Sequence, residues 1–257
     1  MKVVAINGSP NRETGTTALV LMPFLAGMEE AGAEVELYYT GDLTIPPLKG
    51  DCNSTSPAPG TAARADDMAW LLPKLTASDV LVLASPVYFW GLTGPTKTLL
   101  DRMIADGSPG TVDRLIPRRT VLVSTCGSWD LDTFDPLLAQ MHAWCRHEST
   151  LYTESLLGSG IPVFSGQRKR AGDRIFAGAL LRPHAPALSW TIQDGVAVSG
   201  VTEGARRAGQ QLATDKVIDK KVLSEISRPL LPKEKYLHLF HQKFAGMPPV
   251  MGQEAGL

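Results

Sequence analysis

A cluster of hydroxyl side chains and glycines near the amino terminus has the composition of an anion-binding loop. The stretch 7–17 reads Asn-Gly-Ser-Pro-Asn-Arg-Glu-Thr-Gly-Thr-Thr, between an apolar run at 3–6 and a segment at 17–31 with apolar residues at helical spacing. A loop between a strand and the start of a helix presents main-chain N–H groups and the positive end of the helix dipole, which together favour an anion. The stretch therefore predicts a phosphate site comprising Ser9, Arg12, Thr14, Gly15, Thr16 and Thr17.

This loop matches neither of the two commonest nucleotide-binding patterns. It contains no Gly-x-Gly-x-x-Gly for a dinucleotide and no Gly-x-x-x-x-Gly-Lys-Ser/Thr for a triphosphate. What remains is a hydroxyl-rich cup for one terminal phosphate, which suits a mononucleotide such as FMN. The alternative from pattern alone is an ordinary connection between a strand and a helix.

Two further loops place special residues after buried strands. The apolar run 80–84 ends in 85–91, Ser-Pro-Val-Tyr-Phe-Trp-Gly, and the predicted strand 120–125 ends in 125–129, Thr-Cys-Gly-Ser-Trp. Aromatic rings confined to a tight loop are suited to stacking on a flat ring, although strands also end in aromatics that pack in the core. Trp129 either covers a pocket or anchors the surface, and Cys126 reads most simply as a small buried apolar residue.

Strands and helices alternate through the first 155 residues. The predicted strands are 3–6, 34–39, 80–84, 120–125 and 149–153, and the predicted helices are 17–31, 66–76, 94–105 and 134–146. This alternation predicts a doubly wound parallel sheet, in which ligands bind beyond the carboxyl ends of the strands. Because the loops 7–17, 85–91 and 125–129 all leave carboxyl ends, we expect them to meet in one place.

The remaining residues predict a less regular second part. We expect a core at 1–157 and a C-terminal extension of loops and helices at 158–257, with helices near 201–214, 217–226 and 232–244. The extension either wraps a neighbouring subunit or covers its own.

Composition narrows the class of protein. The 257 residues carry a net charge of -1, which gives no electrostatic case for nucleic acid, and no run of about 18 apolar residues predicts a membrane span. The first residues enter a strand directly, without the pattern of a secretory leader. The widely spaced Cys52, Cys126 and Cys145 predict a reducing, cytoplasmic setting, no disulfide framework and no metal site.

Four stretches together resemble the NAD(P)H-dependent FMN reductases of the flavodoxin-like superfamily, near the branch of iron–sulfur flavoproteins. They are 7–17, Asp66-Asp67-Met68, the run 85–89 followed by Lys97 and Asp101-Arg102, and the run 226–232, Ile-Ser-Arg-Pro-Leu-Leu-Pro. The resemblance implies a five-stranded sheet in the order 2-1-3-4-5, an FMN phosphate site in the first loop, and homodimers or homotetramers. It also implies two loops around the flavin ring, with the contact residues Pro86, Val87, Tyr88, Phe89, Trp90, Thr125, Cys126, Gly127 and Trp129.

The chain departs from this family in two places. Thr16 stands where the family commonly has Asn, which removes one expected hydrogen bond to the phosphate. The iron–sulfur members carry a compact cysteine cluster before Asp-Asp-Met, whereas here 48–54 contains Cys52 alone. Because a four-iron cluster needs four protein ligands, we expect FMN without an iron–sulfur cluster.

The residue patterns and the resemblance together predict that this protein is an oxidoreductase. NADPH or NADH would reduce bound FMN, which would then reduce a small, flat acceptor such as a quinone, a nitro or azo compound, or free flavin. No acid–base pair can be assigned from spacing, as expected where the cofactor supplies the chemistry. One alternative is a flavodoxin-like electron carrier, although true flavodoxins are strongly acidic. Another is a protein that has lost flavin binding.

Overall fold

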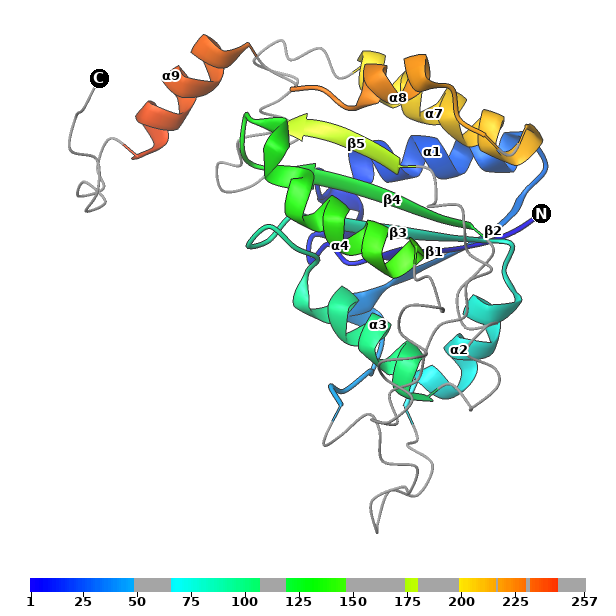
Figure 1. Ribbon diagram of the computed structural model, residues 1–257. Helices are drawn as coiled ribbons and strands as arrows, with labels where there is room; N and C mark the ends of the chain where they lie inside the picture. Colours follow the sequence, from blue (N-terminus) through cyan, green and yellow to red (C-terminus); the bar gives the residue numbers. More distant parts are fainter. Residues whose placement is uncertain are drawn as a thin grey trace.

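The strand β1 (Lys2–Asn7) lies inside a parallel sheet, between β2 (Glu34–Tyr39) and β3 (Val80–Pro86). The computed structural model describes residues 1–48, 66–106, 119–146, 174–179, 199–215, 217–229 and 232–244. β4 (Arg119–Cys126) pairs with β3, and β5 (Arg174–Ala179) pairs with β4, so the strand order is β2-β1-β3-β4-β5 (Figure 1). The chain crosses from one side of β1 to the other between β2 and β3, which places the topological switch point at β1 and β3.

The predicted parallel α/β fold is confirmed, as is the order of the first four strands. The range predicted for the fifth strand, 149–153, lies outside the described residues, and so does the boundary predicted at residue 157. β5 lies instead within 158–257, the segment expected to contain only loops and helices. Its sequence, Arg-Ile-Phe-Ala-Gly-Ala, has no alternation of polar and apolar residues, so the pattern did not reveal it.

Helices cover both faces of the sheet (Figure 1). α1 (Ala18–Glu30), α7 (Ser199–Thr214) and α8 (Lys220–Ile226) cover one face, and α2 (Met68–Ala77), α3 (Gly94–Asp106) and α4 (Asp135–Arg146) cover the other. Because both faces are covered, the central strands are apolar, and all seven residues of β3 are buried. No helix in the described part of the chain combines the length and the hydropathy that a membrane crossing requires.

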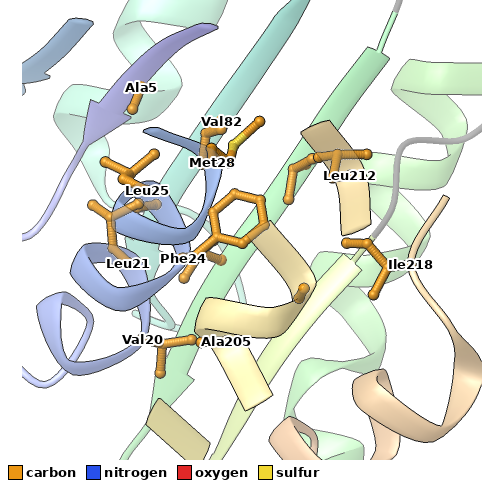
Figure 2. Close-up of a cluster of buried hydrophobic side chains, with 14 of the residues drawn as sticks. Ala5, Val20, Leu21, Phe24, Leu25, Met28, Val82, Ala205, Leu212 and Ile218 are labelled. Atoms are coloured by element: carbon orange, nitrogen blue, oxygen red, sulfur yellow. The ribbon is translucent and has the colours of Figure 1, made fainter. Parts of the chain in front are cut away.

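The main apolar core on one face lies between α1, α7 and the sheet (Figure 2). Two glycines allow the backbones of α1 and α7 to touch. A Cβ atom at Gly27 would lie 2.0 Å from the carbonyl oxygen of Arg206, and one at Gly209 would lie 2.0 Å from that of Phe24. Through α7 the C-terminal third therefore packs on its own subunit, which is one of the two arrangements expected for the extension.

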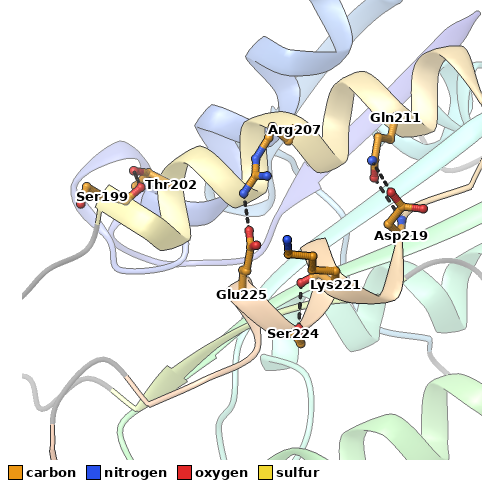
Figure 3. A network of polar contacts seen from close by, with 8 residues as sticks. All are labelled: Ser199, Thr202, Arg207, Gln211, Asp219, Lys221, Ser224 and Glu225. Atoms are coloured by element: carbon orange, nitrogen blue, oxygen red, sulfur yellow. Dashed lines mark hydrogen bonds and ion pairs between the residues drawn. The ribbon is translucent and has the colours of Figure 1, made fainter.

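Polar side chains fasten α8 to α7 (Figure 3). Arg207 of α7 forms an ion pair with Glu225 of α8. Gln211 donates to the carboxylate of Asp219 at 2.8 Å and accepts a hydrogen bond from the Asp219 main-chain N–H at 3.0 Å. Asp219 directly precedes α8, so this pair of bonds attaches the start of α8 to α7.

The carboxyl ends of β1, β3 and β4 lie at one edge of the sheet, and hydrogen bonds join the loops that leave them. The main-chain N–H of Gly8 donates to the carbonyl of Ala84 at 2.7 Å, and that of Val87 donates to the carbonyl of Thr125 at 2.9 Å. The expected meeting of the loops 7–17, 85–91 and 125–129 is thus confirmed. α9 (Lys233–Phe244) lies beyond the same edge (Figure 1).

Candidate functional site

The loop 8–17 folds into a compact turn through its own main chain. Asn7, the last residue of β1, accepts a hydrogen bond from the main-chain N–H of Ser9 at 2.8 Å. The Ser9 carbonyl accepts one from the N–H of Arg12 at 3.1 Å, and a single 3₁₀ turn, Arg12–Thr14, follows before α1. The loop therefore begins in the buried end of β1 and finishes at the start of a helix, the arrangement that favours an anion.

Two glycines in this loop leave no room for a side chain. A Cβ atom at Gly15 would lie 2.7 Å from the hydroxyl of Ser9, and one at Gly8 would lie 1.8 Å from the hydroxyl of Thr96. The Thr93 hydroxyl donates to the Gly8 carbonyl at 2.9 Å and lies 2.9 Å from the Thr96 hydroxyl. The loop is thus packed tightly on β3 and α3 by residues that the sequence analysis did not include in the site.

A cluster of threonine hydroxyls connects the first loop to the third. The hydroxyl of Thr125, at the end of β4, lies 3.0 Å from that of Thr17 and 3.3 Å from that of Thr16. All three side chains are buried. Thr125 was expected to border the flavin ring, and the structure places its hydroxyl against the threonines of the predicted phosphate loop.

Asn7 contributes a further polar group that the sequence analysis did not assign. Its side chain is fully buried, and among the described residues its Nδ2 atom has no hydrogen-bond partner. Buried donors are nearly always paired, so this amide beside the first loop is a candidate donor to a ligand. The available signal was a polar residue that ends an otherwise apolar strand.

Arg12 and Thr14 lie on the outer side of the loop. The Arg12 guanidinium forms an ion pair with Asp42 and lies 5.9 Å from the ring centroid of Tyr39. Arg12 also has a positive φ of 47°, which is uncommon for a residue with a side chain. The hydroxyl of Thr14 donates to the carbonyl of Asn11 at 2.8 Å. Both side chains are therefore engaged with protein groups in this structure.

Tyr39 and Glu13 form the neighbouring polar contact. The Tyr39 hydroxyl bonds to the Glu13 carboxylate, which lowers the pKa of Glu13. Burial, followed by this bond, raises the pKa of Tyr39 to about 12, so the phenol remains a donor at neutral pH. Together with Arg12 and Asp42, this pair forms the rim of the loop, where one cation, Arg12, faces two carboxylates, Glu13 and Asp42.

The second loop is a tight turn with aromatic residues at both central positions. Tyr88 and Gly91 exchange two main-chain hydrogen bonds of 3.0 Å, and the residues between them, Phe89 and Trp90, have φ values of 48° and 57°. Turns of this kind normally hold Asn or Gly, because side chains resist positive φ. Phe89 is 98% exposed and Trp90 57%, with their rings edge to face at 6.3 Å.

This exposure decides between the two readings of the aromatic run. A packing role in the core is wrong for Phe89 and Trp90, because both rings face away from the protein interior. Backbone strain that the surrounding structure maintains is typical of functional sites. Pro86 and Val87 position the turn, since Pro86 ends β3 and the Val87 N–H bonds to β4.

The third loop turns sharply after β4. The thiol of Cys126 is buried and donates to the carbonyl of Ser128 at 3.4 Å, and burial raises the pKa of this thiol to about 11. A thiol with such a pKa is a poor nucleophile and a poor ligand, since the thiolate is the reactive form. This agrees with the simple reading of Cys126 as a small buried residue.

Residues of α9 contact this third loop from outside. The Tyr236 hydroxyl donates to the Gly127 carbonyl at 3.2 Å, and the Lys233 ammonium lies 5.1 Å from the ring centroid of Trp129. These contacts could not be found from sequence, because more than 100 residues separate the helix from the loop.

A buried ion pair joins α3 to the residues just before α2. Arg102 pairs with Asp66 at 2.8 Å and donates to the carbonyl of Pro46 at 2.9 Å. Thr44 and Asp67 exchange hydrogen bonds of 2.6 and 3.1 Å. These contacts tie together the two ends of the segment 49–65, which contains Cys52 and lies outside the described residues. Within the described ranges, no group of three or more His, Cys, Asp or Glu side chains could hold a metal ion.

Comparisons with known proteins agree with this geometry. The family model of NADPH-dependent FMN reductase matches residues 1–145. An iron–sulfur flavoprotein of Methanocaldococcus jannaschii is 37% identical over 102 residues, which are 40% of this chain and 51% of that protein. One from Archaeoglobus fulgidus is 38% identical over 112 residues, 44% of this chain and 50% of that protein. The chain therefore spans about half the length of the curated relatives it matches.

A solved structure shares the fold over a longer range. An FMN-dependent NADH-azoreductase from Bacillus anthracis, in complex with FMN, has a TM-score of 0.50 and 15% identity, covering 83% of this chain and all of that one. At this identity the likeness concerns the fold alone. The family match, in contrast, includes all three loops of the site and more than half of the sequence, and this chain belongs to the NADPH-dependent FMN reductase family.

Proposed function

We propose that this protein binds FMN at the carboxyl edge of its sheet and transfers a hydride from NADPH or NADH to a small, flat acceptor. The observation that carries the proposal is the meeting of a phosphate-type loop and an exposed aromatic turn at one edge of the sheet. Family membership supports the same cofactor and donor.

The first loop fits the phosphate of FMN. Gly15 lets the loop pack closely on the Ser9 hydroxyl, and the buried hydroxyls of Thr16 and Thr17 lie at the start of α1. The unpaired Nδ2 of Asn7 supplies a donor with no protein acceptor among the described residues. In this proposal Ser9, Thr16 and Thr17 hold the phosphate, and Arg12 would add its charge by leaving its exposed ion pair with Asp42.

The second and third loops fit the flavin ring and its partners. Bound FMN would supply the hydride chemistry, and the protein would bind, orient and tune it. Tyr88, Phe89 and Trp90 offer flat apolar surfaces on which a ring can stack. Main-chain N–H groups near Gly127 would face the polar edge of the ring and favour its reduced, anionic form. The open aromatic surface supports a flat acceptor such as a quinone, a nitro or azo compound, or a flavin.

We further propose that the protein works without an iron–sulfur cluster, although its curated relatives are named iron–sulfur flavoproteins. A four-iron cluster takes four ligands, and the whole chain contains three cysteines. One of these, Cys126, is buried with a raised thiol pKa. Iron analysis of anaerobically purified protein, with an absorbance scan near 400 nm, tests this point.

An assembly of two or four identical subunits also belongs to the proposal. In such an assembly the exposed aromatic turn would lie near a neighbouring subunit, so that each site is shielded from water. Light scattering coupled to gel filtration tests it, and a monomer at micromolar concentration would contradict it.

The decisive experiment is an anaerobic titration of the FMN-loaded protein with NADH and, separately, with NADPH, followed by the visible spectrum. The proposal expects the flavin to bleach within seconds with at least one nucleotide, and reoxidation by a quinone or an azo dye should restore it. Bound flavin that neither nucleotide reduces would indicate a flavodoxin-like carrier instead. A protein that holds no flavin after reconstitution would refute the site assignment.

A further inference from the structure

The third loop, 125–129, is contacted by α9, a helix more than 100 residues further along the chain. Tyr236 and Lys233 lie three residues apart on α9, and therefore on one face of the helix. The Tyr236 hydroxyl donates to the Gly127 carbonyl at 3.2 Å, and the Lys233 ammonium lies 5.1 Å from the centre of the Trp129 ring. One helix face thus contacts the loop at two points.

The contacts act on the main chain of the turn. The Trp129 main-chain N–H also bonds to the Tyr236 hydroxyl, which opposes the effect of burial on the pKa of that phenol. Tyr236 therefore joins the carbonyl of Gly127 to the N–H of Trp129 through one oxygen atom. The Cys126 thiol and the N–H of Asp130, the residue after the loop, bond to the carbonyl and hydroxyl of Ser128. The loop is consequently held from within and from α9.

A loop of this kind needs such support to act on a ligand. Gly127 is exposed and Ser128 and Trp129 are half-buried, so little packing fixes the turn. Main-chain N–H groups stabilise a developing charge only where they are already oriented before the reaction. A cation over the face of Trp129 further restricts the ring of that residue.

We propose that α9 is a clamp on the third loop, in which Tyr236 is a positioning residue and Lys233 a secondary one for flavin binding. The inference rests on the proposed function, because it assigns these residues to the same site. It adds that α9 sets the shape of the part of the site that would face the flavin ring, whereas the first loop takes its shape from its contacts with β3, β4 and α3.

The test uses the full-length protein with Tyr236→Phe, which removes the hydroxyl and keeps the ring, and Lys233→Met. Tyr38→Phe is the matched control, since the hydroxyl of Tyr38 bonds to Glu36 on β2. Affinities for FMN and for riboflavin, which lacks the phosphate, are measured by quenching of flavin fluorescence. Tyr236→Phe removes both hydrogen bonds of the hydroxyl. We expect roughly a fivefold weaker affinity for both flavins, because only part of the free energy of these two bonds is coupled to flavin binding. We expect a smaller loss in Lys233→Met and none in Tyr38→Phe.

Two further readouts separate positioning from general destabilisation. The reduction potential of bound FMN should become more negative in Tyr236→Phe, because the N–H groups no longer favour the reduced anion. Amide hydrogen exchange at 127–130 should be faster in the flavin-free variant, with unchanged exchange in β1 and β3. Unchanged affinity for both flavins, or weakened binding of FMN alone, would overturn the clamp. If the unmodified protein binds neither flavin, the proposed function fails, and the exchange experiment decides on the clamp by itself.

Discussion

The side-chain hydroxyl of Thr17 lies 3.0 Å from that of Thr125, although 108 residues separate the two in sequence. Thr16 joins them at 3.3 Å. Three hydroxyls carry three donor protons, and these two contacts use two of them. The third proton is left to donate to an anion while both contacts stay intact. The strand β4 thereby supports the first loop directly, and if that loop binds phosphate as proposed, a change in β4 should alter the phosphate affinity.

Replacing Thr125 by Val should weaken FMN binding about five- to tenfold, because a lost hydrogen bond near a charged ligand contributes roughly 1–1.5 kcal/mol. Riboflavin affinity should change by less than twofold, since the phosphate is missing. Flavin fluorescence titration measures both. Thr76→Val is the matched control, because the Thr76 hydroxyl bonds to the Pro73 carbonyl on the exposed side of α2. Equal losses for both flavins would place Thr125 beside the ring instead.

Much of the fold could be predicted because its signals are local. Apolar runs bounded by polar loops identified β1, β3 and β4, and helical spacing located α1, α2, α3 and α4 within a few residues. The position of the site followed from the same pattern, since loops after parallel strands meet at one edge. The segment around β5 was missed because Gly and Pro interrupt it and its six residues do not alternate.

Details of the site depend on contacts between distant residues, which the pattern does not contain. The pairing of Arg12 with Asp42, the bond from Tyr236 to Gly127 and the buried pair of Arg102 and Asp66 join positions 30 to 109 residues apart. The type of each side chain was visible, but its partner was not. The exposure of Phe89 likewise required the turn geometry, since an aromatic at the end of a strand is equally typical of the core.

Gly209 offers a test of how closely α7 must approach α1. An added Cβ would lie 2.0 Å from the Phe24 carbonyl oxygen, so the helices must separate in Gly209→Ala. We expect this variant to lose about 1–3 kcal/mol of unfolding free energy, the usual cost of overpacking, despite the better helix propensity of Ala. Urea denaturation measures it. Gly41→Ala serves as the control because a Cβ atom added there would meet no other atom within 4 Å. Similar unfolding free energies of the two variants would mean that α7 can move away from α1 without loss of stability.

The buried thiol of Cys126 should make the unfolding free energy of the protein depend on pH in the alkaline range. Burial raises the pKa of its thiol from an ordinary value of 9.0 to about 11, so the folded protein disfavours the thiolate. This contribution is complete below pH 9.0 and is lost as the pH rises through about 11. In a Cys52→Ser, Cys145→Ser background, the unfolding free energy should therefore decline between these pH values, and replacing Cys126 by Ala should flatten the decline.

The burial of Cys126 also predicts slow alkylation: at pH 8, iodoacetamide should modify Cys126 in the folded protein much more slowly than it modifies a free thiol. Rapid modification would contradict its burial.

The turn at Phe89 and Trp90 predicts a conflict between stability and activity. Positive φ at a bulky residue costs of order 1–3 kcal/mol, and Gly adopts it freely. Phe89 is 98% exposed, so its removal forfeits almost no buried surface. Phe89→Gly should therefore raise the unfolding free energy by about 1 kcal/mol, after the greater flexibility of Gly in the unfolded chain is counted. Phe89→Ala is the matched control, because it removes the same ring and keeps the strained φ, and its stability should stay unchanged.

Both variants lack the ring, so both should lose kcat/KM for a flat acceptor by about fivefold, in line with the energy of one aromatic contact. Stopped-flow reoxidation of the reduced protein by a quinone isolates this step from reduction by the nicotinamide donor. If Phe89→Ala reoxidises at the unmodified rate, the ring contacts no acceptor. If Phe89→Gly gains no stability over Phe89→Ala, the strain at this turn is relieved by the surrounding loop.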